Sequence, residues 1–241
     1  MVRDASRPSG DHTPGGRFIV LEGGDGVGKT TQVTLLTAWL AAAGAPHVAV
    51  REPGGTAVGE AIREIVLGRV DLHMPPESEL LLLLAARAAV VRQVILPALA
   101  RGETVIADRY ALSTLAYQGY GRGLDVDVVR RALAVATGGL EPDLYLLLDL
   151  PVEEGMERGR RDGSSPDRIE REGGDFRHKV REAYLALAES ELDVEVVRAD
   201  GLPEEVQARI RRKLEARFPG EFPSGAHPEQ SPEALRRENP R

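Results

Sequence analysis

Short apolar runs alternate along this chain with longer segments of helical character. Five runs are rich in Val, Ile and Leu and show no alternation of apolar and polar positions; they lie at residues 18–22, 47–51, 104–108, 144–149 and 194–197. Strands that are covered on both faces have this pattern. The segments between them predict helices at residues 29–43, 58–67, 77–100, 126–137, 152–161, 175–189 and 203–217. The alternation predicts one α/β domain, in which a five-stranded parallel sheet carries helices on both faces.

The two ends of the chain differ in composition from the part between them. Residues 1–16 and 219–241 are rich in Pro, Gly, Ser and charged side chains. Segments of this kind bury too little apolar surface to offset the conformational entropy that folding removes. We therefore expect a disordered tail at each end of a folded domain that covers residues 17–218.

Charge and residue usage exclude several classes of function. The net charge of −7 argues against a surface whose main role is to bind nucleic acid. The chain has no cysteine, so disulfides, thiolate catalysis and cysteine-ligated zinc are excluded. Its five histidines show no metal-ligand spacing such as H-x-x-x-H, which argues against a dedicated zinc site.

No membrane segment is predicted. The first 16 residues are polar and lack the apolar centre of a signal peptide. The most apolar run, "ELLLLLAARAAVV" at residues 79–91, is interrupted by Arg87 and is shorter than the roughly 20 residues that span a bilayer. We interpret this run as a buried helix and expect a cytoplasmic protein.

A glycine-rich segment, "GGDGVGKT", lies between the first predicted strand and the first predicted helix. It fits the pattern G-x-x-x-x-G-K-[ST], in which backbone N–H groups surround phosphate oxygens without intervening side chains, at the positive end of a helix dipole. Lys29 is expected to reach the β- and γ-phosphates of a nucleotide, and the Thr30 hydroxyl to bind Mg²⁺. The nucleotide-binding residues that this P-loop predicts are Gly23, Gly24, Asp25, Gly26, Val27, Gly28, Lys29, Thr30 and Thr31.

Two further segments place charged residues at the carboxyl ends of predicted strands, where α/β sheets bind their ligands. "REPGGT" begins with Arg51, and "DRYALSTLAYQG" begins with Asp108 and Arg109. Asp108 ends an apolar strand, as a carboxylate that holds Mg²⁺ would. Ser113 and Tyr117 are four residues apart and therefore share a helical face. A plain surface charge at Arg51 and core packing of Tyr117 are the alternative interpretations.

Arginines also occur in two unusual settings. Arg87 interrupts an apolar helix, and because a buried unpaired charge is costly, we expect it to meet a substrate phosphate or an internal carboxylate. The segment "ERGRRDGSSPDRIERE" carries five arginines around a Gly-Ser-Ser-Pro break. A helix, loop and helix of this kind can close over phosphates, and we expect such a lid at about residues 157–174. An exposed hairpin whose acidic residues pair with the arginines is the alternative.

Together these segments resemble those of the thymidylate kinase family, whose members are nucleoside-monophosphate kinases of the P-loop class. The matching pieces run in family order from about residue 17 to residue 217: "FIVLEGGDGVGKTTQ", "REPGGT", "AARAAVVRQVILPAL", "DRYALSTLAYQGYGRG", "PDLYLLLDLP" and "DRIERE…FRHKVREAYLALA". "REPGGT" and "DRY-x-x-S-x-x-AYQG" are the most specific of these, whereas many families share the P-loop. The resemblance implies a P-loop NTPase fold of the nucleoside-monophosphate kinase type and the reaction ATP + dTMP → ADP + dTDP with Mg²⁺.

The resemblance also implies roles for individual residues. Mg²⁺ would be held by Thr30 and Asp108. The 5′-phosphate of the acceptor would be neutralised by Arg51, Arg87 and Arg109, of which Arg87 can also face the base.

On the sugar and base, the resemblance places Asp25 near the 3′-hydroxyl and Tyr117 against the deoxyribose, where the ring would disfavour a 2′-hydroxyl. The base pocket would be lined by Leu83, Ser113, Thr114 and Gln118. Asp200 and the turn after the fifth strand would lie near the adenine of ATP.

The source of the catalytic arginine divides the family into two branches. One branch has an arginine at the position of Gly26, and the other, common in bacteria, supplies it from the lid. Because this chain has glycine in the P-loop and many lid arginines, it resembles the lid-arginine type. Arg158 and Arg160 are the leading candidates and Arg161 follows them; Asp25, Lys29 and Arg109 complete the implied catalytic set.

Two positions depart from the family pattern. Leu83 stands where a phenylalanine that stacks on thymine is usual, and Ala89 where the side chain is often polar. A base–aromatic stack contributes roughly 1–3 kcal/mol, so leucine predicts looser base selection. The first alternative function is therefore a kinase for dUMP or another, or 5-modified, deoxypyrimidine monophosphate. A non-catalytic P-loop switch is a more distant alternative, since the chain lacks the N-K-x-D motif that reads guanine.

The expected partners follow from the same resemblance. ATP and dTMP are the expected small molecules, and neither nucleic acid nor a membrane is expected. Family members are usually homodimers joined through helices such as those predicted at residues 58–67 and 77–100. An apolar helix face there fits dimerisation, but it fits ordinary core burial as well.

Overall fold

The computed structural model describes residues 16–161, 167–191 and 193–223. Within these residues, five strands form one sheet in which every neighbouring pair is parallel, in the order β2-β3-β1-β4-β5. The strands are β1 (Phe18–Glu22), β2 (His47–Arg51), β3 (Thr104–Asp108), β4 (Leu144–Asp149) and β5 (Val194–Arg198). The predicted fold class is confirmed. The predicted strand bounds differ only at β5, which is one residue longer.

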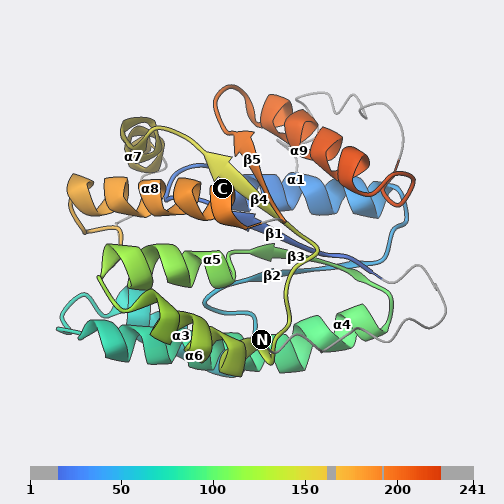
Figure 1. Cartoon of the computed structure of the whole chain (residues 1–241). Helices are drawn as coiled ribbons and strands as arrows, with labels where there is room; N and C mark the ends of the chain where they lie inside the picture. Colours follow the sequence, from blue (N-terminus) through green and yellow to red (C-terminus); the bar gives the residue numbers. More distant parts are fainter. Residues whose placement is uncertain (1–15, 162–166, 192, 224–241) are drawn as a thin grey trace, which may run out of the picture.

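Helices connect the strands (Figure 1). They are α1 (Lys29–Ala42), α2 (Ala57–Arg63), α3 (Pro76–Val90), α4 (Leu96–Ala100), α5 (Ala111–Thr114), α6 (Val126–Thr137), α7 (Val152–Arg161), α8 (Gly174–Ser190) and α9 (Pro203–Arg217). In the described part of the chain, π-helical segments continue three of them: η1 (Glu64–Gly68) follows α2, η2 (Val91–Ile95) follows α3, and η3 (Leu115–Gly121) follows α5. The apolar pattern does not predict the helix made by α5 and η3, although the spacing of Ser113 and Tyr117 indicates a helical turn there.

The sheet separates two apolar cores. On one face, α1 and α9 bury side chains such as Leu36 and Ile210. On the other face, α3 and α6 bury side chains such as Leu84 and Val129 (Figure 1). Tyr184 of α8 belongs to the same core. Every residue of the central strand β1 is buried, which explains the apolar run from Phe18 to Leu21. Burial of one large aliphatic side chain stabilises the fold by roughly 1.5–3 kcal/mol, so the two cores fix the sheet that carries the site.

The strand order determines where a ligand can bind. The chain passes from β1 to β2, returns to β3 between them, and then crosses to β4 on the other side of β1. Connections therefore leave the carboxyl ends of β1 and β3 in opposite directions, and open α/β sheets bind ligands at such a point. The glycine-rich segment follows β1, and Asp108 ends β3 beside Leu21.

The helical stretch from Pro76 to Ala100 is 25 residues long and, by length and composition alone, long and apolar enough to cross a membrane. The run at residues 79–91, which alone is too short to span a bilayer, lies within this longer helix, and the helix agrees with the one predicted at residues 77–100. Core helices of soluble proteins meet the same criterion. This helix packs Leu84 into a core cluster and buries Glu79 and Arg87 in polar contacts, so we interpret it as a core helix.

The described C-terminal residues continue beyond α9 as packed structure. The ring of Phe222 is buried and stacks on Trp39, with the ring centroids 6.2 Å apart. Glu221 accepts a hydrogen bond of 2.7 Å from Arg17. Part of the segment expected to be a tail, 219–241, therefore packs against the domain. The rest of that segment, and residues 1–15, lie outside the described residues.

Candidate active site

The P-loop connects β1 to α1 and needs glycine at three positions. Gly23, Gly26 and Gly28 have φ values of +136°, +75° and +96°, a region that other residues rarely adopt. The Lys29 ammonium is buried under this loop and donates to the carbonyl oxygens of Gly23 and Gly24, at 3.1 and 2.6 Å. Burial, and next the nearby Arg109, lower the pKa of Lys29 to about 8. A cationic donor therefore sits beneath the loop, where a phosphate would lie.

The tip of the P-loop lies against α7, whose last residues belong to the predicted lid. A Cβ added at Gly26 would be 2.1 Å from the carbonyl oxygen of Gly155, and one added at Gly155 would be 2.7 Å from the carbonyl oxygen of Asp25. Real Cβ atoms do not approach oxygen so closely, so both positions exclude a side chain unless the backbone moves. An arginine at position 26 therefore has no room in this structure.

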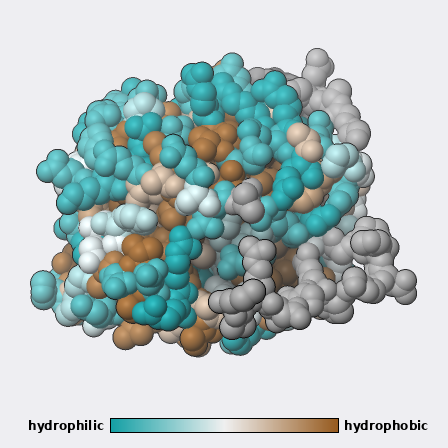
Figure 2. All heavy atoms as spheres, in the orientation of Figure 1, coloured by the Kyte–Doolittle hydropathy of each residue, from teal (hydrophilic) through white to brown (hydrophobic). Residues whose placement is uncertain are grey.

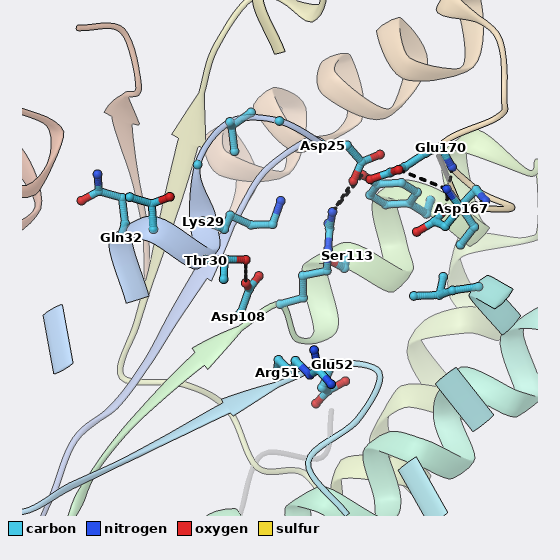
Figure 3. A pocket seen from close by; sticks show the side chains of 18 of the residues that line it. Asp25, Lys29, Thr30, Gln32, Arg51, Glu52, Asp108, Ser113, Asp167 and Glu170 are labelled. Carbon is cyan, nitrogen blue, oxygen red and sulfur yellow. Dashed lines mark hydrogen bonds and ion pairs between the residues drawn. The ribbon is translucent and has the colours of Figure 1, made fainter. Parts of the chain in front are cut away.

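Thr30 and Asp108 form an oxygen-rich pair at the start of α1 and the end of β3. The Thr30 hydroxyl donates to a carboxylate oxygen of Asp108 at 2.8 Å, and Figure 3 shows the two side chains facing each other. Hydroxyl and carboxylate oxygens are the ligands that Mg²⁺ prefers. Among the described residues, no group of three or more His, Cys, Asp or Glu side chains is arranged to hold a metal, so a cation here would need oxygens from nucleotide or water.

One cleft of about 590 Å³ runs along the carboxyl edge of the sheet. The P-loop, the Thr30–Asp108 pair, and residues from the predicted acceptor side all line it. Its lining includes Asp25, Gly26, Val27, Gly28, Lys29, Thr30, Thr31, Arg51, Leu83, Arg87, Asp108, Arg109, Ser113, Thr114, Tyr117 and Gln118. Gly23 and Gly24 lie just outside this lining, and Ala89 does not contribute to it. The sequence-predicted residues for both substrates therefore meet in one cavity.

Asp25 and Arg109 form an ion pair at the centre of the cleft. The Tyr117 hydroxyl donates to the same carboxylate at 3.1 Å, and Arg177 of α8 lies 3.8 Å from its other oxygen. Burial opposes ionisation of Asp25, but Arg109, Lys29 and Arg177 together hold the pKa of this carboxyl below its usual value. Arg109 has a φ of +75°, which is uncommon for a residue with a side chain. Asp25 is therefore ionised and fixed in place.

Arg87 has an internal carboxylate as its partner, which is one of the two alternatives that the sequence leaves open. Its Nε donates to Glu52 at 2.6 Å, and its terminal nitrogens donate to the Thr114 hydroxyl at 2.7 Å and the Tyr110 carbonyl at 2.8 Å. Both members of the ion pair are buried. Burial raises the pKa of Glu52 to about 7, although Arg87 acts in the opposite direction. Arg51 is exposed and pairs with Glu60.

The predicted base-pocket residues are engaged in hydrogen bonds beside the cleft. The Ser113 hydroxyl donates to Glu22 at 2.6 Å, and Gln118 donates through its amide nitrogen to Glu79 at 2.9 Å. Leu83 also lines the cleft and provides an apolar side chain.

The arginines of the predicted lid differ in where they lie. Arg158 lines the cleft and donates to the Ala199 carbonyl at 3.0 Å. Arg161 also lines the cleft, although its side chain is largely exposed and bonds to Glu157. Arg160 is absent from the cleft lining and is bound to Glu157. Residues 162–166 of the predicted lid lie outside the described residues.

The end of the cleft expected for adenine is built by the turn after β5. Gly201, Pro203 and Val206 line it, together with Gln32 of α1. Asp200 does not; its carboxylate is bound to Arg198 and Arg209.

Several buried polar residues of the site are not predicted from the sequence. Glu22 is fully buried and accepts hydrogen bonds from the backbone and hydroxyl of Ser113, the backbone of Tyr110 and the hydroxyl of Tyr184. Glu52 and Glu79 are also buried, and Arg177 is partly buried. Glu22 ends an apolar run and Glu79 directly precedes one, so each carries a weaker form of the signal that Arg87 gives as a charge within an apolar helix. Arg177 lies in a charged helix and has no such signal.

Comparisons with known proteins point to one family. A family model described as thymidylate kinase matches residues 21–210, a range that contains the whole cleft lining. A thymidylate kinase from Pelotomaculum thermopropionicum is 53% identical over 173 residues, which are 72% of this chain and 80% of that protein. Thymidylate kinases from Methylococcus capsulatus and Synechococcus sp. (strain CC9605) are each 48% identical, over 86% and 83% of this chain and 99% and 97% of those proteins.

Proposed function

The chain belongs to the thymidylate kinase family, and we propose that it transfers the γ-phosphoryl group of ATP to dTMP, which gives dTDP and ADP. The protein is thus a nucleoside-monophosphate kinase. One observation carries the chemistry: a single cleft joins the P-loop to the group of Arg51, Arg109 and Asp25. Phosphoryl transfer needs two anionic groups held in line with their charge neutralised, and little covalent chemistry from the protein.

We assign the donor nucleotide to the P-loop end of the cleft. The backbone N–H groups of the loop would bind its phosphates, and Lys29 would exchange the carbonyl oxygens of Gly23 and Gly24 for phosphate oxygens. The turn at Gly201 and Pro203 would flank the adenine. This orientation places the γ-phosphate next to the acceptor side of the cleft.

Mg²⁺ fits the Thr30–Asp108 pair, because both groups offer hard oxygen ligands at the expected phosphate position. When bound, the ion supplies positive charge that neutralises the β- and γ-phosphates. The side chains of Thr30 and Asp108 would hold it there.

We assign the acceptor phosphate to Arg51 and Arg109 and the base to Arg87. Arg51 is exposed, and within the described ranges it pairs with the surface carboxylate of Glu60, a contact that an incoming phosphate can replace. Arg87 is neutralised by Glu52 and has three hydrogen bonds inside the protein. It is therefore less suited to a phosphate, and its remaining N–H groups can bind polar atoms of the base. Asp25 and Tyr117 would contact the sugar.

The catalytic arginine of the lid is assigned to Arg158. Its side chain lines the cleft, and Gly26 leaves no room for an arginine in the P-loop. Arg161 is the second candidate, and Arg160 is a weaker one because it turns to Glu157.

Product analysis tests the proposed reaction. Purified protein with Mg-ATP and dTMP should form dTDP and ADP in equal amounts, and the Lys29→Met variant should form almost none. ATP binding without turnover of any monophosphate would contradict the proposal and favour a non-catalytic P-loop module.

Leu83 supports a second candidate substrate, which is dUMP or a 5-modified deoxypyrimidine monophosphate. This side chain lines the cleft where an aromatic ring would stack on thymine, and an aliphatic group there places fewer demands on the base. A kinase for dUMP or a 5-modified deoxypyrimidine monophosphate would use the same phosphoryl-transfer residues.

We also propose that the protein is a cytoplasmic homodimer. Figure 2 shows apolar side chains at the surface on the side of the molecule where α3 and α6 lie. Leu81 of α3 and Val135 of α6 are 64% and 79% exposed, and Val58 of α2 is 51% exposed. Sedimentation should give twice the 26.1 kDa of one chain; a species of one chain mass at all concentrations would contradict the dimer.

A further inference from the structure

A buried carboxylate on α3 connects segments that lie far apart in the sequence. Glu79 is 1% exposed and accepts hydrogen bonds from Gln118 at 2.9 Å, from Arg122 at 3.2 Å, and from Arg168. Burial opposes ionisation, but the hydrogen bonds from Gln118, Arg168 and Arg122 hold the pKa of Glu79 below its usual value. Glu79 is therefore a charged group that can only accept hydrogen bonds.

This carboxylate determines which way the Gln118 amide faces. An ionised carboxylate has no proton to donate, so the NH₂ group of Gln118 must point to Glu79. Gln118 also lines the cleft, close in sequence to Thr114 and on the end assigned to the base. The carbonyl oxygen of the amide is thus the atom that remains for the cleft. Glu79 fixes a hydrogen-bond acceptor there without contacting the cleft itself.

We propose that Glu79 is a positioning residue for base selection, which acts by turning the carbonyl of Gln118 toward the pyrimidine. A carbonyl acceptor pairs with the N3–H group of a 4-keto pyrimidine such as thymine or uracil. In cytosine N3 is itself an acceptor, so two lone pairs would face each other. The inference rests on the proposed function and adds to it a source of specificity that Leu83 does not provide.

The Glu79→Gln variant has a defined consequence. One carboxylate oxygen faces Gln118 and the Nε of Arg122; the other faces the terminal nitrogens of Arg122 and Arg168. A glutamine must place its NH₂ group at one of these two positions. Arginine has only donors and cannot adapt, and the first position faces one arginine nitrogen whereas the second faces two. The Gln118 amide at the first position can instead rotate by half a turn and accept a hydrogen bond. The new NH₂ group should therefore face Gln118, which then presents its own NH₂ group to the base.

The test is the ratio of kcat/KM for dTMP to kcat/KM for dCMP. The ratio should fall about tenfold or more in E79Q, because a site built for one hydrogen-bond pattern strongly rejects the other. The KM for ATP should stay near the wild-type value. Arg122→Gln is the matched control: it removes one arginine from the same carboxylate but keeps the Glu79–Gln118 bond, so its ratio should stay within about twofold of wild type.

If E79Q fails to fold, a second variant can still test whether Gln118 selects the base. Gln118→Met has similar length but no polar group, and it should lower the same ratio while leaving Glu79 with its two arginines. A folded E79Q with the wild-type ratio would overturn the inference, as would a wild-type ratio in Q118M or an equal loss in R122Q. A wild-type protein that does not phosphorylate dTMP would instead overturn the proposed function.

Discussion

Individual residues in the cleft are held in states that suit an incoming anion. Lys29 is the best example, because burial and Arg109 lower its pKa to about 8. A growing fraction of the free protein therefore has a neutral Lys29 above pH 8. Phosphates favour the charged form, so ATP has to restore the proton when it binds.

This gives a prediction for the pH dependence of ATP binding. The pKa is lower in the free protein than in the complex, so binding takes up a proton above pH 8. The Kd for ATP should rise by up to about tenfold per pH unit there. Calorimetry in buffers of different ionisation enthalpy measures both effects. Lys29→Arg keeps its charge and should bind ATP without this rise; an equal rise in K29R would contradict the assignment.

A second prediction at this scale concerns Arg87, the partner of Glu52 in a buried ion pair. Arg87→Met leaves the carboxyl without its counter-charge, and such a change typically destabilises a protein by about 3–5 kcal/mol. The pKa of Glu52 is already raised to about 7. A raised folded-state pKa means that stability falls as pH rises from the unfolded value through the folded one. Urea unfolding should therefore show a larger loss in R87M at pH 8 than at pH 5.

The double variant Glu52→Gln/Arg87→Met provides the control for that experiment. It lacks the titrating carboxyl, so its loss of stability should depend less on pH. Equal pH dependence in the two variants would show that Glu52 is not the group involved.

At the scale of elements, α7 places one of its arginines in the cleft and another at the solvent-exposed surface. Arg158 lines the cleft, whereas Arg160 faces Glu157 and solvent. We expect Arg158→Ala to lower kcat about 10²- to 10³-fold, a range typical for loss of one group that stabilises transition-state charge. Arg160→Ala should change kcat less than about twofold, because exposed ion pairs contribute little. Steady-state kinetics with dTMP would decide, and equal losses would contradict the assignment.

The same helix contains two glycines that test its contact with the P-loop. A Cβ at Gly155 would lie 2.7 Å from the carbonyl oxygen of Asp25, whereas nothing lies within 4 Å of one at Gly159. Gly155→Ala should lower both the melting temperature and kcat, because it forces α7 away from the loop. Gly159→Ala should leave kcat unchanged and stabilise the helix by up to about 1 kcal/mol. If G155A and G159A had the same melting temperature and the same kcat, the contact between Gly155 and the P-loop would not be required for stability or catalysis.

At the scale of the whole molecule, the sequence predicts the structural features that are determined by residues adjacent in the chain. The strands follow from local apolar runs such as residues 18–22, and the glycine spacing identifies the P-loop between β1 and α1. Long-range partners cannot be predicted in this way. Glu52 and Arg87 are 35 residues apart, and Glu79 and Arg168 are 89 apart. Local patterns contain no information about which distant element packs beside a charge.

The sequence also does not predict which arginines of the predicted lid lie in the cleft, because this depends on the tertiary structure. In the sequence, Arg158 and Arg160 look equivalent. In the structure, the helical rotation between them takes one to the cleft and the other to Glu157. Likewise, the need for Gly155 arises only because the fold brings α7 against the loop at residues 23–28. Local sequence patterns therefore predict which kinds of residue a site contains, whereas tertiary packing determines which of their side chains line the cleft.

Substrate preference tests the central claim most directly. The purified protein would be mixed with Mg-ATP and, separately, with dTMP, dUMP, 5-hydroxymethyl-dUMP, dCMP, dGMP and UMP, and kcat/KM measured from ADP release. We predict that dTMP is the best acceptor and UMP a poor one. Another monophosphate that is phosphorylated about tenfold more efficiently than dTMP, a difference of roughly 1.4 kcal/mol in transition-state binding, would contradict thymidylate as the substrate.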